Sequence, residues 1–147
     1  MKNRLIWLLL SLLGLATTVA CDGESQTEYG TPYATFSVKG KVTDTNGKGI
    51  PGIQISATEG YSTTAVYSDS EGLFDCRWDA WPSVPYATAL CFKDIDGAEN
   101  GEFDSREVSA VFNEQDMIED SQQSWYHGTY RIRLDVTLTE KQSEKHE

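Results

Sequence analysis

Histidine is scarce in this sequence, and its scarcity excludes several kinds of chemistry. Only two histidines, His127 and His146, occur among 147 residues. A zinc site is poorly supported, because such sites combine several histidine or cysteine ligands at short spacing. Nucleophilic catalysis needs a base positioned beside the nucleophile, and no Ser-His-Asp or Cys-His arrangement is visible. The sequence therefore predicts a protein that is not an enzyme.

Positive charge is also in short supply. The chain has 12 Lys and Arg residues against 23 Asp and Glu residues, and its formal net charge is −11. If the first 21 residues are removed, Lys2 and Arg4 go with them and the net charge becomes −13. A protein this acidic repels a phosphate backbone, so nucleic acid is excluded as a partner.

No apolar run is long enough to span a membrane. The longest, residues 5–16, would form a helix of roughly 18 Å, whereas a bilayer needs about 20 apolar residues. Lys2 and Arg4 precede this run, and small or modest residues follow it. A positive start, an apolar middle and a small-residue end are typical of a secretory signal peptide, which is expected to be helical.

The leader ends in a cysteine. Residues 18–21 read TVAC, which resembles a lipobox, although Thr18 stands where leucine is usual. The resemblance implies that residues 1–21 are a lipoprotein signal peptide and that Cys21 carries the lipid. Residues 22–32 then form a flexible tether. We expect a protein anchored by lipid in the bacterial cell envelope, in the outer membrane, facing the periplasm or the cell surface.

Cysteine is rare and its count is odd. Besides Cys21, the chain has only Cys76 and Cys91. Lipidation of Cys21 would leave an even pair, and a secreted chain meets an oxidising compartment in which a disulfide can persist. Two readings stay open: a Cys76–Cys91 disulfide, or two free thiols that act as small hydrophobic residues.

A sustained helical period is absent from the mature chain, and strand patterns take its place. Apolar and polar residues alternate between turns rich in Gly, Asn and Asp, most clearly from Tyr130 to Thr139. The expected strands are residues 33–44, 53–57, 62–68, 73–78, 86–93, 106–112 and 130–139. Seven strands within residues 33–139 predict an all-β, antiparallel sandwich of two sheets.

Two segments show no such alternation. Residues 113–129 make a long acidic loop, in which Met117 and Ile118 are expected to form a helical turn. Residues 140–147 form a charged tail, which we expect to be disordered.

Hard oxygen ligands are concentrated in residues 94–104. Calcium binds six to eight such oxygens, but the sixth and twelfth positions do not fit an EF-hand. A looser calcium site would use Asp94, Asp96, Asn100 and Glu102. The alternative is a turn whose side chains cap their own backbone. With calcium left open, no other cofactor is expected.

Several aromatic residues lie close to predicted loops. They are Trp78, Trp81, Tyr86, Trp125 and Tyr126. Exposed at the end of a sandwich, such side chains could stack on sugars or hold a protein partner. The alternative is that they fill the core and fasten the loops.

Three segments resemble carboxypeptidase-regulatory-like domains, which have the transthyretin-like (prealbumin-like) sandwich fold. They read VKGKVTD at residues 38–44, GKGIPGIQI at 47–55 and YSDSEGLF at 67–74. The resemblance implies the same fold here. Domains of this kind are structural or binding modules on many extracellular proteins, so the fold alone implies no enzyme.

A second resemblance covers most of the chain. YGTPYA at residues 29–34, DIDG at 94–97, NGEF at 100–103 and WYHG at 125–128, together with Cys21, are similar to radical SAM-associated lipoproteins of the Bacteroides and Prevotella type. We therefore expect a non-catalytic envelope module that binds an unidentified envelope protein or glycan. The alternative is a client that a neighbouring radical SAM enzyme modifies.

Overall fold

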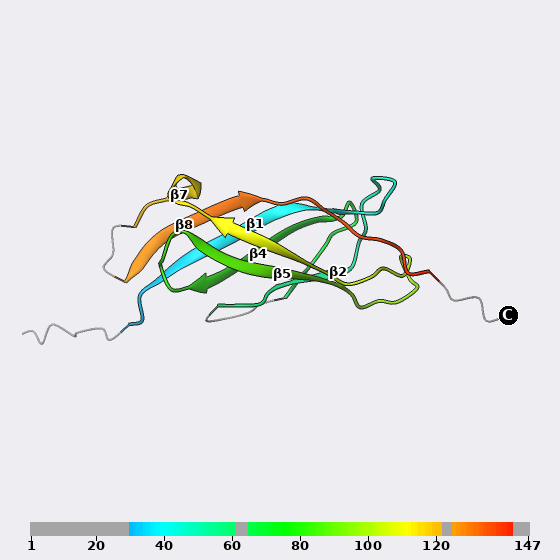
Figure 1. Ribbon diagram of the computed structural model, residues 1–147, viewed down its shortest axis with the longest axis horizontal. Coiled ribbons are helices and arrows are strands. Elements are labelled where there is room, and N and C mark those ends of the chain that lie inside the picture. The colour runs from blue at the N-terminus through cyan, green and yellow to red at the C-terminus, as the bar shows by residue number, and fades with distance from the viewer. Residues whose placement is uncertain (1–29, 61–64, 122–124, 143–147) are drawn as a thin grey trace, which may run out of the picture. The chain divides into compact units, whose positions relative to one another are not determined.

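Strands make up most of the folded chain. The computed structural model describes residues 30–60, 65–121 and 125–142, which form nine strands and one short 3-10 helix (Figure 1). The elements are β1 (Tyr33–Thr43), β2 (Ile53–Ala57), β3 (Val66–Tyr67), β4 (Leu73–Ala80), β5 (Tyr86–Asp94), β6 (Arg106–Phe112), η1 (Glu114–Asp116), β7 (Met117–Glu119), β8 (Tyr126–Arg133) and β9 (Val136–Thr137). Within these three segments, no helix has the length and apolar character needed to cross a membrane. The predicted signal peptide, Cys21 and most of the tether lie outside the described residues.

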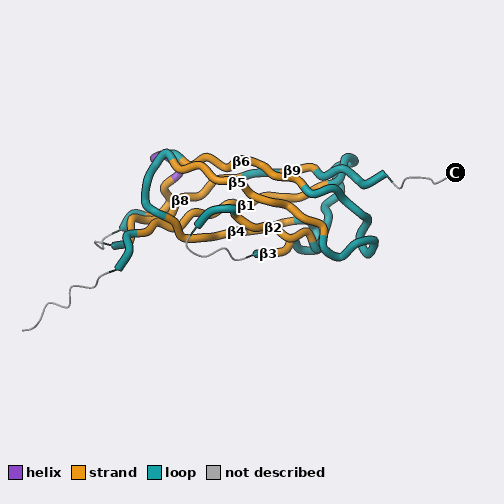
Figure 2. Tube along the Cα trace, turned by 60° about the horizontal axis from the view of Figure 1, so that its bottom comes forward, coloured by secondary structure: helices purple, strands orange, loops and turns teal. Residues whose placement is uncertain are grey.

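The strands form two sheets, as the alternation in the sequence predicts. In the first sheet the order is β4-β1-β8-β7, and β9 also pairs with β1; in the second the order is β3-β2-β5-β6. Loops gather at the two ends of the strands (Figure 2). The prediction of an all-β chain with two sheets is confirmed.

The prediction that every pair is antiparallel is wrong. β1 runs parallel to β8, with Ser37 opposite Arg131 and Lys39 opposite Arg133, and it also runs parallel to β9. Parallel neighbours need a long crossover connection, and here the chain builds the whole second sheet between β1 and β8. The other pairs, including β1 with β4 and β2 with β5, are antiparallel.

The core lies between the sheets and is centred on Phe36 of β1. The ring of Phe36 is fully buried and stacks on Tyr86 at 4.2 Å between ring centres and on Tyr130 at 5.4 Å. Phe112 and Trp78 also contact it, at 5.0 and 6.3 Å. Stacked and edge-on aromatic pairs contribute about 1 kcal/mol each beyond the burial of their area. This cluster joins β1, β4 and β8 to β5 and β6.

The expected last strand is divided in two. β8 ends at Arg133 and β9 begins at Val136, although Tyr130, Val136 and Leu138 are buried as their alternation predicts. The break lies beside Gly40: a Cβ atom there would come within 1.8 Å of the Leu134 carbonyl oxygen. Asp135 occupies the gap in the ladder, where its carboxylate accepts a hydrogen bond from the backbone N–H of Lys41 at 2.9 Å.

Two side chains in residues 67–74, Ser68 and Asp69, stabilise turns by hydrogen bonds to the backbone. The buried hydroxyl of Ser68 donates to the carbonyl of Ile50 at 2.7 Å and accepts from the N–H of Ile53 at 2.9 Å, so it holds the Pro51-Gly52 turn. The carboxylate of Asp69 accepts from the N–H groups of residues 71 and 73, both at 2.9 Å. Both side chains satisfy backbone groups that a tight turn would otherwise leave unpaired.

Other boundaries differ from those predicted. Residues 113–129 are not one loop, because they contain η1 and β7 and the start of β8. The helical turn covers Glu114–Asp116 rather than Met117 and Ile118, and the Asp116 carboxylate caps it by accepting from the N–H of Asn113 at 2.8 Å. The predicted tail begins with paired residues: Glu140 bridges to Phe103, and the N–H of Lys141 donates to Glu102 at 2.8 Å.

Replacing Gly40 with alanine should destabilise the sandwich, since the new Cβ would collide with the Leu134 backbone. We expect a loss of about 3 kcal/mol in the free energy of unfolding, measured by urea denaturation. Gly47→Ala is the matched control: Gly47 has a φ of +82° but no neighbour within 4 Å, so only backbone strain of about 1 kcal/mol applies. Equal losses for the two variants would contradict the assigned role of Gly40.

Candidate binding groove

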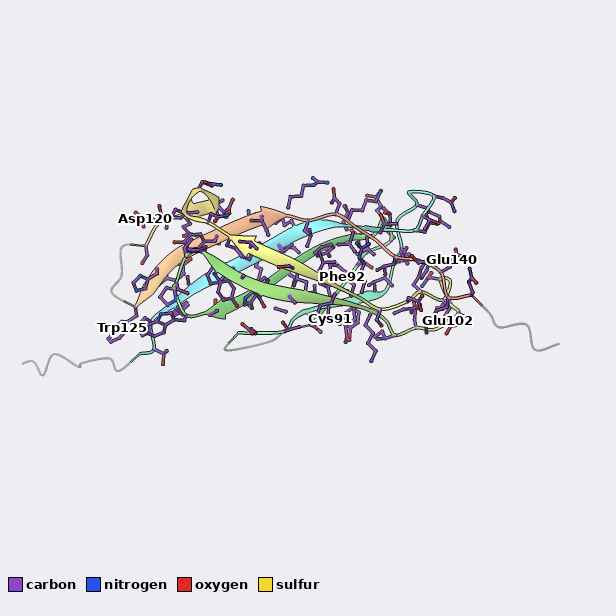
Figure 3. All side chains as sticks on the ribbon, in the orientation of Figure 1. Cys91, Phe92, Glu102, Asp120, Trp125 and Glu140 are labelled. Atoms are coloured by element: carbon purple, nitrogen blue, oxygen red, sulfur yellow. The ribbon has the colours of Figure 1, made fainter. Side chains whose placement is uncertain are left out.

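The two described cysteines do not pair. Cys76 is buried on the core side of β4, whereas Cys91 is half-buried on β5 between the core residues Leu90 and Phe92, on the outer side of the second sheet (Figure 3). Both thiols are free in this structure, as the interpretation of two small hydrophobic residues requires. Burial raises the pKa of Cys76 to about 11, so this thiol stays protonated and unreactive.

The residues of the expected calcium site are occupied by other contacts. The Asp94 carboxylate accepts from the N–H of Asp96 at 3.3 Å and of Phe103 at 2.8 Å. Asn100 donates to the Asp96 carboxylate at 2.7 Å, and Glu102 pairs with the Lys141 ammonium at 3.1 Å. Among residues 30–60, 65–121 and 125–142, no group of three or more acidic, histidine or cysteine side chains is placed to hold a metal ion. The geometry is that of a turn capped by its own side chains.

The aromatic residues noted in the sequence divide into two groups. Trp78 belongs to the core, where its indole N–H donates to the hydroxyl of the half-buried Tyr86 at 3.2 Å. Trp81 is 54% exposed, and Trp125 and Tyr126 are half-buried. The alternative of a core residue therefore holds for Trp78, and Trp81 has the exposure that the binding hypothesis requires.

A charged network covers the outer face of the first sheet. Because even-numbered residues of β1 face the core, Ser37 and Lys39 face outward, and the register places β4 and β8 side chains on either side of them. Asp75 of β4 is the centre: its carboxylate accepts from Arg77 at 2.9 and 3.2 Å, from Ser37 at 3.1 Å, and lies 3.1 Å from the Lys39 ammonium.

Hydrogen bonds shift the pKa of Asp75. The guanidinium of Arg77 is the main cause; partial burial acts in the opposite direction, and Lys39 and Ser37 add to the lowering. Together they bring the pKa from 3.8 to about 2. The carboxylate is therefore charged at every physiological pH and holds Arg77 and Lys39 in place.

The same face collects cations. Five of the chain's 12 Lys and Arg residues lie on β1, β4 and β8 with their side chains on the outer face. We call them the cationic cluster: Lys39, Lys41, Arg77, Arg131 and Arg133. Asp75, Asp79 and Asp135 are the acids beside them. Arg133 is loosely held, since its side chain is 75% exposed and its ion pair to Asp135 is 3.4 Å long. A positive patch on an acidic protein focuses anions onto one place.

An open groove of about 460 Å³ adjoins this cluster. It is lined by residues of β1, β3, β4 and β8. Lys39, Asp75 and Arg133 supply charged groups; Val66, Leu73 and Phe74 supply apolar surface; and Tyr67, whose side chain is 54% exposed, supplies an aromatic ring. Ligand sites commonly have this volume and this mixture of apolar walls and a few polar groups.

The sequence did not reveal this groove. The alternation in residues 33–44 places Lys39 and Lys41 on one side of a strand, but nothing local shows that Arg77, Arg131 and Arg133 lie next to them. That proximity follows from the register of β1 with β4 and β8, which joins residues about 40 and 94 positions apart.

Comparison with known proteins shows the fold and no more. No family model matches the chain, and no curated protein matches it. Hydroxyquinol 1,2-dioxygenase from Pseudomonas putida DLL-E4 is similar in structure, with a TM-score of 0.50 and 8% identity over 91% of this chain and 71% of that one.

Two further solved structures are more distant. 3-Chlorocatechol 1,2-dioxygenase from Rhodococcus opacus 1CP has a TM-score of 0.49 and 12% identity over 78% of this chain. Catechol 1,2-dioxygenase from Pseudomonas arvilla C-1 has a TM-score of 0.46 and 12% identity over 82%. The chain spans less than two thirds of either protein, 63% and 56%. At such identities a similar fold carries no information on activity, so the dioxygenase activity is stated of those proteins alone.

The lowered pKa of Asp75 makes a prediction about acid stability. A carboxylate whose pKa is lower in the folded state stabilises the fold fully above its ordinary pKa, here 3.8, and loses this contribution as the pH falls toward 2. Because the side chain is 33% exposed, solvent screening limits the effect to about 1 kcal/mol. Urea denaturation between pH 7 and pH 2.5 should show a shallower loss for Asp75→Asn than for the wild type.

A second variant serves as a control in case Asp75→Asn does not fold. Arg77→Met keeps the carboxylate and removes its main hydrogen-bond donor, so its pH dependence should lie between those of the wild type and Asp75→Asn. If all three proteins lose stability in parallel, Asp75 is not the group that titrates.

Proposed function

We propose that this protein is a lipid-anchored, non-catalytic module of the bacterial cell envelope. The support for the anchor is the leader: Lys2 and Arg4, the apolar residues 5–16 and the lipobox-like TVAC ending at Cys21. Two or three acyl chains on one cysteine hold a protein stably on a membrane, where a single chain does not. The anchor would place the sandwich in the outer membrane, facing either the periplasm or the cell surface.

The sandwich itself we assign to the transthyretin-like, carboxypeptidase-regulatory-like class. The segments that carry the resemblance contribute a strand and its turns to the sandwich. Residues 38–42 form part of the central strand, Ser68 and Asp69 fasten turns, and Gly72 has a φ of +82° in a place where a Cβ atom would lie 2.3 Å from the Val42 carbonyl oxygen. In that class the domain is a structural or binding module, which agrees with a role in binding.

The groove supports a carboxylated glycan as the ligand, and this observation carries the proposed function. Arg133 has one long ion pair, so its guanidinium can form the two parallel hydrogen bonds by which arginine binds carboxylates. The exposed ring of Tyr67 offers a flat apolar surface for a sugar ring. The Asp69 carboxylate also lines the groove; its Oδ1 accepts from the turn backbone, and its Oδ2 can accept hydrogen bonds from sugar hydroxyl groups.

Binding to polygalacturonate, a polymer of uronic acids, would test the groove. We expect the full mature protein in detergent to bind it, and Arg133→Gln to bind about 10-fold more weakly, a loss of about 1.4 kcal/mol. Lys93→Gln is the matched control, because it removes the same charge from an exposed position on β5 of the other sheet. Isothermal titration calorimetry would measure both.

A second polymer separates sugar recognition from simple charge attraction. Poly-L-glutamate carries carboxylates without sugar rings, so it should bind more weakly than polygalacturonate, and Tyr67→Ala should weaken only the glycan. Equal affinity for the two polymers, or equal losses in Arg133→Gln and Lys93→Gln, would contradict the glycan proposal.

The anchor has its own test. Full-length protein produced in a Gram-negative host with labelled palmitate should incorporate the label and sediment with membranes, whereas Cys21→Ala should do neither. Cys91→Ala, which also removes a cysteine, should be labelled like the wild type. An unlabelled wild-type protein would refute lipidation. In a host that also produces the neighbouring radical SAM enzyme, an intact mass that differs from that of the peptide and its acyl chains would favour the radical SAM client instead.

A further inference from the structure

Four aromatic residues gather at one end of the first sheet. Ala80 pairs with Ala34, so Trp81 follows β4 beside Tyr33, and Tyr33 in turn pairs with Tyr126 of β8. The rings of Tyr33 and Tyr126 are 5.3 Å apart, and the N–H of Tyr33 donates to the Trp125 carbonyl at 2.8 Å. Three neighbouring strands thus contribute to one cluster, which we call the aromatic rim: Tyr33, Trp81, Trp125 and Tyr126.

The rim is open to solvent. Trp81 is 54% exposed, and the other three side chains are half-buried. Trp81 is among the most exposed large hydrophobic side chains of the described residues. The core holds a separate aromatic cluster around Phe36, so the rim is not needed to fill it.

The rim lies where the chain enters the domain. β1 begins at Tyr33, whose N–H bonds to the Trp125 carbonyl. Trp125 lies at one end of the sandwich, and Glu102 and Glu140 lie at the opposite end (Figure 3). Eleven residues, 22–32, separate Cys21 from Tyr33, and fully extended they reach at most about 40 Å. A lipid on Cys21 would therefore keep Tyr33 within about 40 Å of the membrane.

We propose that the aromatic rim rests in the interfacial layer of the membrane that holds the Cys21 lipid; the inference depends on the lipid anchor proposed above. Trp and Tyr favour this layer because their rings are apolar while their N–H and O–H groups stay hydrated. The anchor also removes most of the entropic cost of bringing rim and membrane together, since the second contact becomes intramolecular.

Charge selects the kind of lipid surface. Glu119, which lies opposite Thr129 in the β7–β8 pair, and Asp120 belong to the same end of the molecule, and the tether adds Asp22, Glu24 and Glu28. Anionic headgroups would repel these carboxylates. The rim therefore suits a zwitterionic surface, such as one rich in phosphatidylethanolamine.

Contact of the rim with the membrane would also determine how far the groove lies from the membrane surface. Lys39 lies six residues after Tyr33 on the same outer face of β1, a distance of about 20 Å along a strand. With the rim in the interface, Lys39 and Arg133 would stand beyond the headgroups, where a glycan can reach them.

Fluorescence quenching by lipid would test the proposal. The mature lipoprotein, purified with its lipid, is reconstituted into phosphatidylethanolamine–phosphatidylcholine vesicles with brominated or unbrominated acyl chains. Trp7 leaves with the signal peptide, so the emission comes from Trp78, Trp81 and Trp125. We expect brominated lipid to quench the wild type. Trp81→Phe should lose a large part of the quenching, because Trp81 is the most exposed of the three tryptophans; the half-buried Trp125 of the rim should account for the rest, since Trp78 is buried in the core.

A control at the other end of the sandwich makes the test specific. Ile95 is 49% exposed in the turn after β5, and Ile95→Trp in the Trp81→Phe protein should restore emission without restoring quenching. A protein that floats with the vesicles but has an unquenched Trp81, or equal quenching at positions 81 and 95, overturns the rim contact alone. A protein that does not float overturns the lipid anchor and the rim contact together.

Discussion

The close approach of the Leu134 backbone to Gly40 is the constraint on which the first sheet depends. β1 pairs with β4 along one edge and with both β8 and β9 along the other. The change from β8 to β9 takes place at Leu134 and Asp135, and it fits against β1 only because residue 40 has no side chain. The register fixed in this way places Arg131 opposite Ser37 and Arg133 opposite Lys39, and so creates the cationic cluster.

The sequence predicted the strands better than their partners, for a physical reason. A strand with one buried face shows an alternation that can be read locally: residues 106–112 were predicted to the residue, and residues 33–44 to within one. Pairing depends instead on contacts between distant segments. Hence the parallel neighbours of β1, the short β7 and the break at Leu134 had no local signal, and the antiparallel expectation was wrong.

The local sequence also could not decide what the candidate site residues do. A carboxylate in a Gly- and Asn-rich turn can bind a cation or cap the backbone, and both uses favour the same residues; in the structure Asp94 caps Asp96 and Phe103. For the cysteines the sequence left two alternatives open. On β4, Cys76 lies on the same side as the large apolar residues Phe74 and Trp78, which indicates the core side. On β5, both sides carry apolar residues, so the sequence alone could not decide on which side of the strand Cys91 lies.

The outer face of β1 joins the two proposals into one arrangement. Its first outward residue, Tyr33, belongs to the aromatic rim, and Lys39 belongs to the groove. Because β1 is paired on both sides, the backbone positions of these two residues are fixed relative to one another. The remaining surface is strongly acidic, which opposes adsorption of the domain on its side to an anionic membrane or polymer. A short tether, an aromatic end and a cationic cluster farther along the same strand together favour an upright domain that offers its groove away from the membrane.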